Sequence, residues 1–81
     1  MILRVRFFAA ARDLSGHECV EVSLPDGASV ADLRVELARR FPRLAPGLRH
    51  MLFAIDTDYA AESRLLLDGQ EIACIPPVSG G

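Results

Sequence analysis

The sequence has 81 residues, of which 51% are hydrophobic and 25% charged, and its net charge is -2. A chain of this size closes around one hydrophobic core, and its charge balance excludes the basic surface that binding to nucleic acid needs. Two cysteines are too few for a disulfide scaffold, and no apolar stretch is long enough to span a bilayer. We therefore expect one folded domain in the cytoplasm, without a nucleic-acid or membrane partner.

Two strands are predicted near the start of the chain. In residues 2–8 and again in residues 17–24, apolar residues alternate with polar ones, which is typical of half-buried strands. Residues 9–16 between them are good helix formers that end at Gly16, so we predict a short helical turn there. Because this connection is short, the two strands should be antiparallel.

One long helix is predicted for residues 30–41. Its apolar residues recur at helical spacing: Val30, Leu33, Leu37 and Phe41. Ser29 is suited to cap its start, with Asp32 in the first turn. Glu36 and Arg40 are spaced to pair across one turn. A proline directly after the helix ends it.

The second half of the chain reads mainly as strands. Residues 43–50 are predicted to be a connector, broken at Pro46 and Gly47. Residues 51–55 are continuously apolar, which predicts a strand buried on both faces. A short strand is expected near Tyr59, and residues 71–75 form the last strand.

These elements predict an α+β fold in which one long helix packs across one face of a sheet. Their order resembles the ubiquitin-like β-grasp, a mixed sheet of four to five strands whose first and last strands are adjacent and parallel. We expect residues 1–75 to form this domain and residues 76–81 to form a free, extended tail.

The tail has a composition suited to threading and to chemistry at its end. Two prolines cannot donate hydrogen bonds within a sheet and favour an extended course, and two final glycines carry no side chain that would block a narrow channel. The carboxylate of Gly81 is the group that such a tail offers, and adenylation followed by sulfide transfer would convert it into a thiocarboxylate. The threading residues are Pro76, Pro77, Val78, Ser79 and Gly80.

The whole chain resembles the small subunits of molybdopterin synthase, sulfur carriers of the β-grasp superfamily that also holds ubiquitin. The resemblance is clearest in residues 3–8 with Ala9 and residues 12–14, in residues 67–73, and above all in the ending Ile-Pro-Pro-Val-Ser-Gly-Gly. One departure is the segment of residues 54–59, which stands where many members of the family have an asparagine after the strand.

The resemblance implies a function. An enzyme related to ubiquitin-activating enzymes would use ATP to adenylate Gly81, which then becomes a thiocarboxylate. The tail would enter the large synthase subunit and donate sulfur to cyclic pyranopterin monophosphate, forming the dithiolene of molybdopterin. The family's complex is a heterotetramer whose catalytic groups lie on the large subunit, so this chain is expected to be no enzyme by itself and to bind no cofactor or metal.

An apolar patch is predicted at the base of the tail. If the first and last strands are neighbours, Phe8 and Ile75 lie close together and Val78 follows them, which indicates a partner interface. Arg12 and Arg40 are candidates for charged residues at its rim.

The remaining chemistry-bearing residues receive structural interpretations. Cys74 is expected to pack in the core rather than relay sulfur, and Cys19 receives no role. Neither histidine has metal-ligand spacing, and the acidic residues after position 55 lack the pattern of a calcium loop, so a solvated hairpin is expected there. These residues are His17, His50, Asp56, Asp58 and Glu62.

Alternative functions remain open at this stage. A carrier for thiamin, cysteine or tRNA thiolation shares the fold but usually lacks the paired prolines. A ubiquitin-like modifier would attach Gly81 to other proteins; all nine basic residues here are arginine, so lysine-linked chains are precluded. An interaction module with an inert terminus is the third alternative.

Overall fold

The computed structural model describes residues 1–77, which form five strands and three helices. In chain order these elements are β1 (Ile2–Phe7), α1 (Ala10–Ser15), β2 (Cys19–Ser23), α2 (Val30–Arg40), α3 (Ala45–Leu48), β3 (Leu52–Ile55), β4 (Asp58–Tyr59) and β5 (Glu71–Ile75). The predicted strands, the early helical turn and the long helix are all present, within one or two residues of their expected ends.

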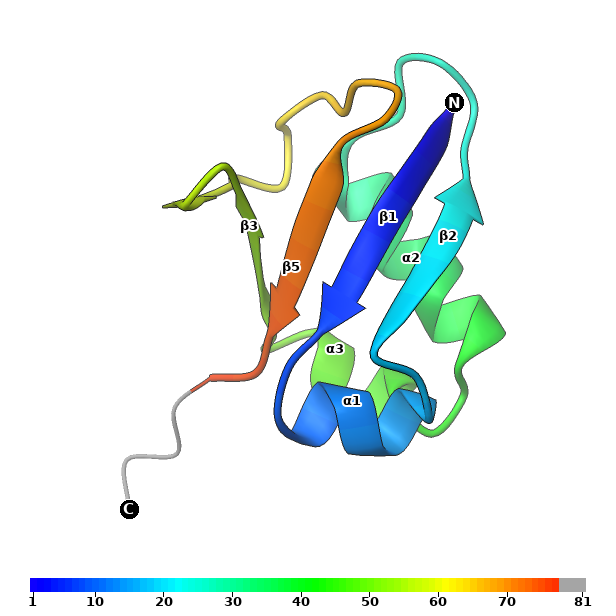
Figure 1. Ribbon diagram of the computed structural model, residues 1–81, viewed down its shortest axis with the longest axis vertical. Helices are drawn as coiled ribbons and strands as arrows, with labels where there is room; N and C mark the ends of the chain where they lie inside the picture. The colour runs from blue at the N-terminus through cyan, green and yellow to red at the C-terminus, as the bar shows by residue number, and fades with distance from the viewer. Residues whose placement is uncertain (78–81) are drawn as a thin grey trace.

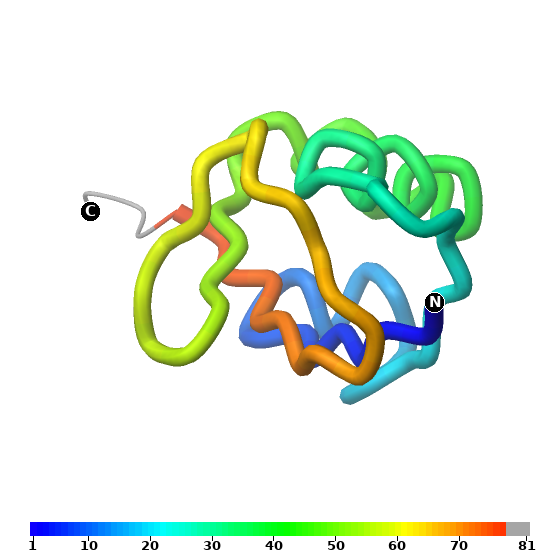
Figure 2. Tube along the Cα trace, turned by 90° about the horizontal axis from the view of Figure 1, so that it is seen from above, coloured from blue at the N-terminus to red at the C-terminus, as the bar shows by residue number. Residues whose placement is uncertain are grey.

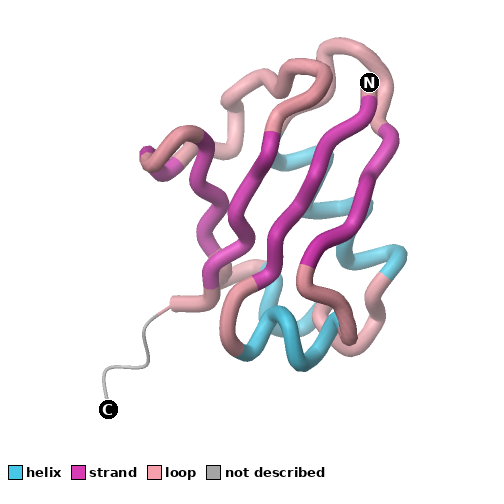
Figure 3. Tube along the Cα trace, in the orientation of Figure 1, coloured by secondary structure: helices cyan, strands magenta, loops and turns pink. Residues whose placement is uncertain are grey.

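The five strands form one mixed sheet in the order β2-β1-β5-β3-β4 (Figures 1 and 3). The first and last strands lie side by side at its centre and are parallel, whereas β2 pairs with β1 and β3 with β5 in antiparallel fashion. The antiparallel start and the parallel centre are both as predicted. This arrangement brings the end of β1 next to the end of β5, from which the tail departs.

The helices cover one face of the sheet (Figure 2). The apolar stripe of α2 is fully buried against the inward side chains of the strands. The buried core includes Leu3, Val5, Phe7, Val22, Val30, Leu33, Leu37, Phe53, Ile55 and Ile72. The fold class is confirmed, although the helical side also includes α1 and α3, which bury Ala11 and Leu48. The opposite face of the sheet has no helix over it within the described residues.

Helix α2 begins as the sequence predicts and pairs its charges differently. The Ser29 hydroxyl accepts from the Asp32 amide at 3.3 Å, and the Asp32 carboxylate accepts from the Ser29 amide at 2.8 Å, which forms a capping box. The predicted Glu36–Arg40 pair is wrong. Glu36 pairs with Arg39 at 2.6 Å, while Arg40 donates to the Glu21 carbonyl on β2 at 2.7 Å. The tertiary contact attracts Arg40 away from its helical neighbour.

Two expectations for the middle of the chain are also corrected. The connector contains the helix α3, and Pro46 lies inside its first turn, where the missing N–H is not needed. The strand β3 is buried on one face only, because Phe53 and Ile55 point into the core while Leu52 is 45% exposed. A continuous apolar run therefore does not indicate two covered faces here; its outward residues need another explanation.

Arg34 joins the helical layer to two loops. Its guanidinium forms a two-pronged ion pair with Glu62, at 2.8 and 2.9 Å, and donates to the carbonyls of Leu48 and Met51. It also lies 4.8 Å from the centre of the Phe53 ring. These contacts fix the segment between α3 and β3 and the loop that follows β4. The Glu62 carboxylate thus has a structural partner, while its side chain remains 55% exposed, which agrees with the interpretation of Glu62 as a solvated residue.

Candidate functional site

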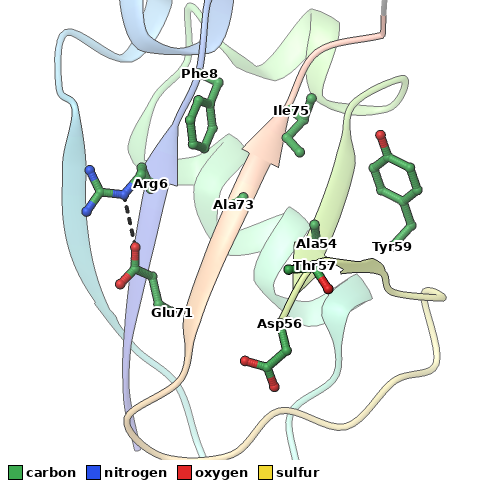
Figure 4. A pocket seen from close by; sticks show the side chains of 9 residues that line it. All are labelled: Arg6, Phe8, Ala54, Asp56, Thr57, Tyr59, Glu71, Ala73 and Ile75. Carbon is green, nitrogen blue, oxygen red and sulfur yellow. Dashed lines mark hydrogen bonds and ion pairs between the residues drawn. The ribbon is translucent and has the colours of Figure 1, made fainter.

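The candidate site lies on the uncovered face of the sheet, where the strand register places small side chains between large ones. Arg6 on β1 is opposite Ala73 on β5, Ala73 is opposite Ala54 on β3, and Ala54 is opposite Tyr59 on β4. One row across four strands therefore has two alanines in the middle and long side chains at its ends. This row forms a shallow groove (Figure 4).

Apolar residues bound the groove on the side of the tail. Phe8 follows β1 and is 42% exposed, and its amide donates to the Cys74 carbonyl at 3.2 Å. Ile75 is half-buried at the end of β5, and both side chains line the groove. Leu52 lies opposite Ile75 in the register and is also exposed. The sequence correctly predicts that Phe8 and Ile75 share a face, and neither the helices nor a loop covers Phe8.

The opposite side of the groove has charged side chains, two of which form an ion pair with each other. Arg6 donates to Glu71 at 2.9 Å, and this hydrogen bond and the carboxylate charge raise the pKa of the guanidinium above its usual value. Asp56 adds an exposed carboxylate at the same side. Arg12 and Arg40, proposed as rim charges, do not line the groove; Arg6 does. Arg6 and Glu71 therefore pair with each other on one side of the groove, and its apolar residues Phe8 and Ile75 lie on the other.

A strained turn directly follows Phe8. Ala9 has φ 49 and ψ -127, the conformation of the first central residue of a type II′ turn, and the Ala11 amide donates to the Phe8 carbonyl at 3.0 Å across it. Glycine normally occupies this position because a Cβ is disfavoured there. The turn holds Phe8 at the point where β1 meets α1.

A second strained turn lies on the other side of the groove. Asp56 and Thr57 connect β3 to β4 as a two-residue hairpin loop, with φ 51 and φ 75. Positive φ at both positions corresponds to a type I′ turn, for which Asn-Gly is the preferred sequence. Aspartate tolerates this region, whereas a β-branched threonine is a true outlier. The segment of residues 54–59, which departs from the family pattern, therefore includes a turn that lines the groove.

The tail leaves the sheet directly beside the groove. Strand β5 ends at Ile75, and the prolines that follow are outside the ladder, as predicted. Pro76 is half-buried and Pro77 is exposed. The other predicted tail residues lie outside the described part of the chain: Val78, Ser79, Gly80 and Gly81.

Cys74, the cysteine nearest the tail, has an unreactive thiol. Cys74 is fully buried, 3.7 Å from the Met51 sulfur, and burial raises the pKa of its thiol to about 12. A thiol with this pKa carries almost no thiolate at neutral pH, so the prediction that Cys74 is a core residue is confirmed. Cys19 is half-buried at the start of β2, opposite Arg6.

The other side chains with the capacity for chemistry are dispersed. His17 and His50 are exposed, as expected, and the His17 ring lies 5.7 Å from that of Phe41. Across residues 1–77 no three histidine, cysteine or acidic side chains come together as a metal site would require. No helix in the same residues is long and apolar enough to cross a membrane.

The chain is similar to known proteins over nearly its whole length. A model of the ThiS family matches residues 5–81. The chain belongs to the ThiS family. Two curated relatives are both called molybdopterin synthase sulfur carrier subunit. The Chlamydomonas reinhardtii protein is 34% identical over 83 residues, covering all of both chains. The Escherichia coli protein is 35% identical and covers 99% of this chain and 100% of its own.

Solved structures of similar proteins show the same fold. The small archaeal modifier protein 1 of Haloferax volcanii superposes with a TM-score of 0.86 at 26% identity, over 100% of both chains. A Helicobacter pylori chain, also 26% identical over 100% of both chains, superposes with a TM-score of 0.72. That chain comes from a complex of subunits 1 and 2 of molybdopterin-converting factor. This ThiS family chain is therefore a β-grasp protein whose relatives carry sulfur or modify proteins.

Sequence reasoning on this ThiS family chain misses part of the groove. It gives no role to Ala54, Ala73 or the Tyr59 side chain, and it places Leu52 in a doubly covered strand. Strand parity alone contains part of the signal, since Ala73 alternates with Ile72 and Cys74 and shares its face with Ile75. The other part is the register between β5 and β3, which places Ala54 opposite Ala73 and cannot be read from the sequence.

Proposed function

We propose that this protein is the sulfur carrier subunit of a molybdopterin synthase and acts through the carboxylate of Gly81. In this proposal an activating enzyme adenylates Gly81 with ATP, sulfide replaces AMP, and the resulting thiocarboxylate donates its sulfur to cyclic pyranopterin monophosphate in the large subunit. The acyl carbon returns to a carboxylate when water completes the transfer. The large subunit supplies the acid and base groups, so this chain acts as substrate and subunit rather than as an enzyme.

The observation that carries the proposal is the placement of the tail. Strand β5 lies at the centre of the sheet, ends at two prolines, and emerges beside an apolar groove that a partner can cover. A tail anchored in a rigid central strand lets a partner bind the domain and receive the terminus at a defined distance. The named relatives, which share the whole length of the chain, support the same conclusion.

The partner face belongs to this proposal as well. We assign Phe8, Ile75 and Val78 to the interface with the large subunit, joined by Leu52 and Tyr59, which are exposed on the same side. The similar Helicobacter pylori chain was solved in a complex of subunits 1 and 2 of molybdopterin-converting factor, which supports this assignment. Assembly into a heterotetramer in the cytoplasm completes the proposal.

Intact-mass measurement tests the chemistry. The protein is produced together with the activating enzyme of its own organism, and we expect the mass gain of one oxygen replaced by one sulfur, localised to Gly81 by fragmentation. A variant with one alanine appended after Gly81 should keep its fold and lose this modification. An unmodified carboxylate in the presence of active enzyme, sulfide donor and ATP would refute the sulfur-carrier role.

A protein modifier is the second candidate, favoured by the likeness to the small archaeal modifier protein. The same co-expression distinguishes it, because a modifier would appear in ATP-dependent conjugates with other proteins. A carrier should yield the thiocarboxylate and no such conjugates. Chains of this protein on itself are not expected through side chains, since it contains no lysine.

A further inference from the structure

The floor of the groove is a hollow between larger side chains. Ala54 and Ala73 are opposite each other on antiparallel strands, both half-buried, and their methyl groups are the shortest side chains in the row from Arg6 to Tyr59. Figure 4 shows the two alanines surrounded by the labelled side chains of their neighbours. The whole groove, which is open to solvent and has the alanines on its floor, has a volume of about 660 Å³, so there is room for a large side chain.

The walls of the hollow are apolar where they are tallest. Phe8 and Ile75 stand on the side of the tail and Tyr59 at the β4 end. The charged side presents Arg6 and Glu71 already paired to each other, so an apolar group seated over the alanines strands neither of these two charges. The Asp56 carboxylate on the same side is exposed to solvent at the edge of the groove. A surface of this form matches an uncharged side chain better than a charged one.

The walls are held by strained backbone. Among the described residues, the non-glycine positions with positive φ are Ala9, Asp56 and Thr57. The first adjoins Phe8, and the other two line the groove directly before β4. Such strain persists where the surrounding structure enforces it and concentrates at binding surfaces, where it preorganises the shape. The two turns fix the backbone beside Phe8 and at Thr57, so the shape of the hollow is set before a partner binds.

We infer that the hollow over Ala54 and Ala73 is a socket for one large apolar side chain, aromatic or branched, on the surface of the large synthase subunit. The inference rests on the proposed function, since it specifies how that partner is recognised. The socket adjoins Ile75, the last residue before the tail, so an anchor seated in it fixes where the tail begins. Anchors of this kind, buried at the centre of an interface, contribute most of the binding energy.

Filling the socket tests the inference. Ala73→Leu and Ala54→Leu each place a branched side chain in the hollow from a different strand, without adding charge. Ala61→Leu is the matched control, because Ala61 is exposed and does not line the groove. Each full-length variant is titrated with the large subunit of the same organism by isothermal calorimetry, after circular dichroism and thermal melting confirm folding.

We expect either socket variant to raise Kd by about 30-fold, the effect of losing one anchor, and the control to change it by less than about twofold. Binding of both folded socket variants with unchanged Kd overturns the inference alone. An equal loss in Ala61→Leu also overturns it, because the effect would not be local. If Ala73→Leu does not fold, Ala54→Leu decides the question. Failure of the unsubstituted chain to bind the large subunit overturns the proposed function and the socket together.

Discussion

Replacement of Arg34 should destabilise this protein far more than the loss of a solvated ion pair on the same helix. Its side chain is only 19% exposed, and its guanidinium bonds Glu62 twice as well as the carbonyls of Leu48 and Met51. Arg34→Met keeps much of the apolar stem and removes every one of these hydrogen bonds. Two backbone carbonyls and a carboxylate then lose their partner in one substitution.

The magnitude follows from these contacts. Hydrogen bonds to a charged group contribute about 1.5–3 kcal/mol each, but solvent reaches the Glu62 end of this network and the contributions overlap. We therefore expect a loss of about 3 kcal/mol in the free energy of unfolding. For a domain of this size that loss lowers the Tm by roughly 15 °C. Arg34→Lys should recover only part, because one ammonium group cannot reach the carboxylate and both carbonyls together.

Urea denaturation followed by circular dichroism measures the effect. Arg39→Met is the matched control on the same helix: Arg39 also pairs with a glutamate, but its side chain is 70% exposed and forms no other hydrogen bond within residues 1–77. Its ion pair is solvated, so its loss should cost no more than about 0.5 kcal/mol. If Arg34→Met and Arg39→Met lose the same free energy of unfolding, the reasoning from the Arg34 network is refuted.

Three further predictions concern backbone strain and the buried thiol. Ala9→Gly should raise the free energy of unfolding by about 1 kcal/mol, because glycine relieves more backbone strain than it costs in added flexibility of the unfolded chain. A lower free energy of unfolding, measured by urea denaturation, would contradict the assigned turn. Thr57→Gly should also stabilise by about 1 kcal/mol, because glycine is the preferred second residue of a type I′ turn, and Thr57→Val, which keeps the β-branch, should not. Burial raises the pKa of Cys74 from 9.0 to about 12, so the native state keeps a proton that the unfolded state releases. Stability should therefore fall as pH rises above 9, by up to about 1.4 kcal/mol per pH unit, and Cys74→Val should lack this slope if the thiol is its source.

Much of the site was predictable because its signals are local. Proline cannot continue a ladder, so the end of β5 at Ile75 follows from the residues themselves. The alternation in β1 predicts which face of the sheet Arg6 occupies. Phe8 comes two residues later, so the same alternation places it on that face. The capping of α2 by Ser29 and Asp32 depends on a spacing of three residues and was likewise correct.

What the sequence determined by itself is most of the elements, although not α3, and the point at which the sheet ends before the tail. Short-range periodicity, helix caps and prolines act within a few residues, so they are readable along the chain. The tertiary structure alone decided which residues meet across strands and loops: the alanines that form the socket, the network around Arg34, and the strained turns at Ala9 and Thr57. Those turns adopt conformations that their residues disfavour, because the strand register and the packing of the helices outweigh a local cost of a few kcal/mol at most.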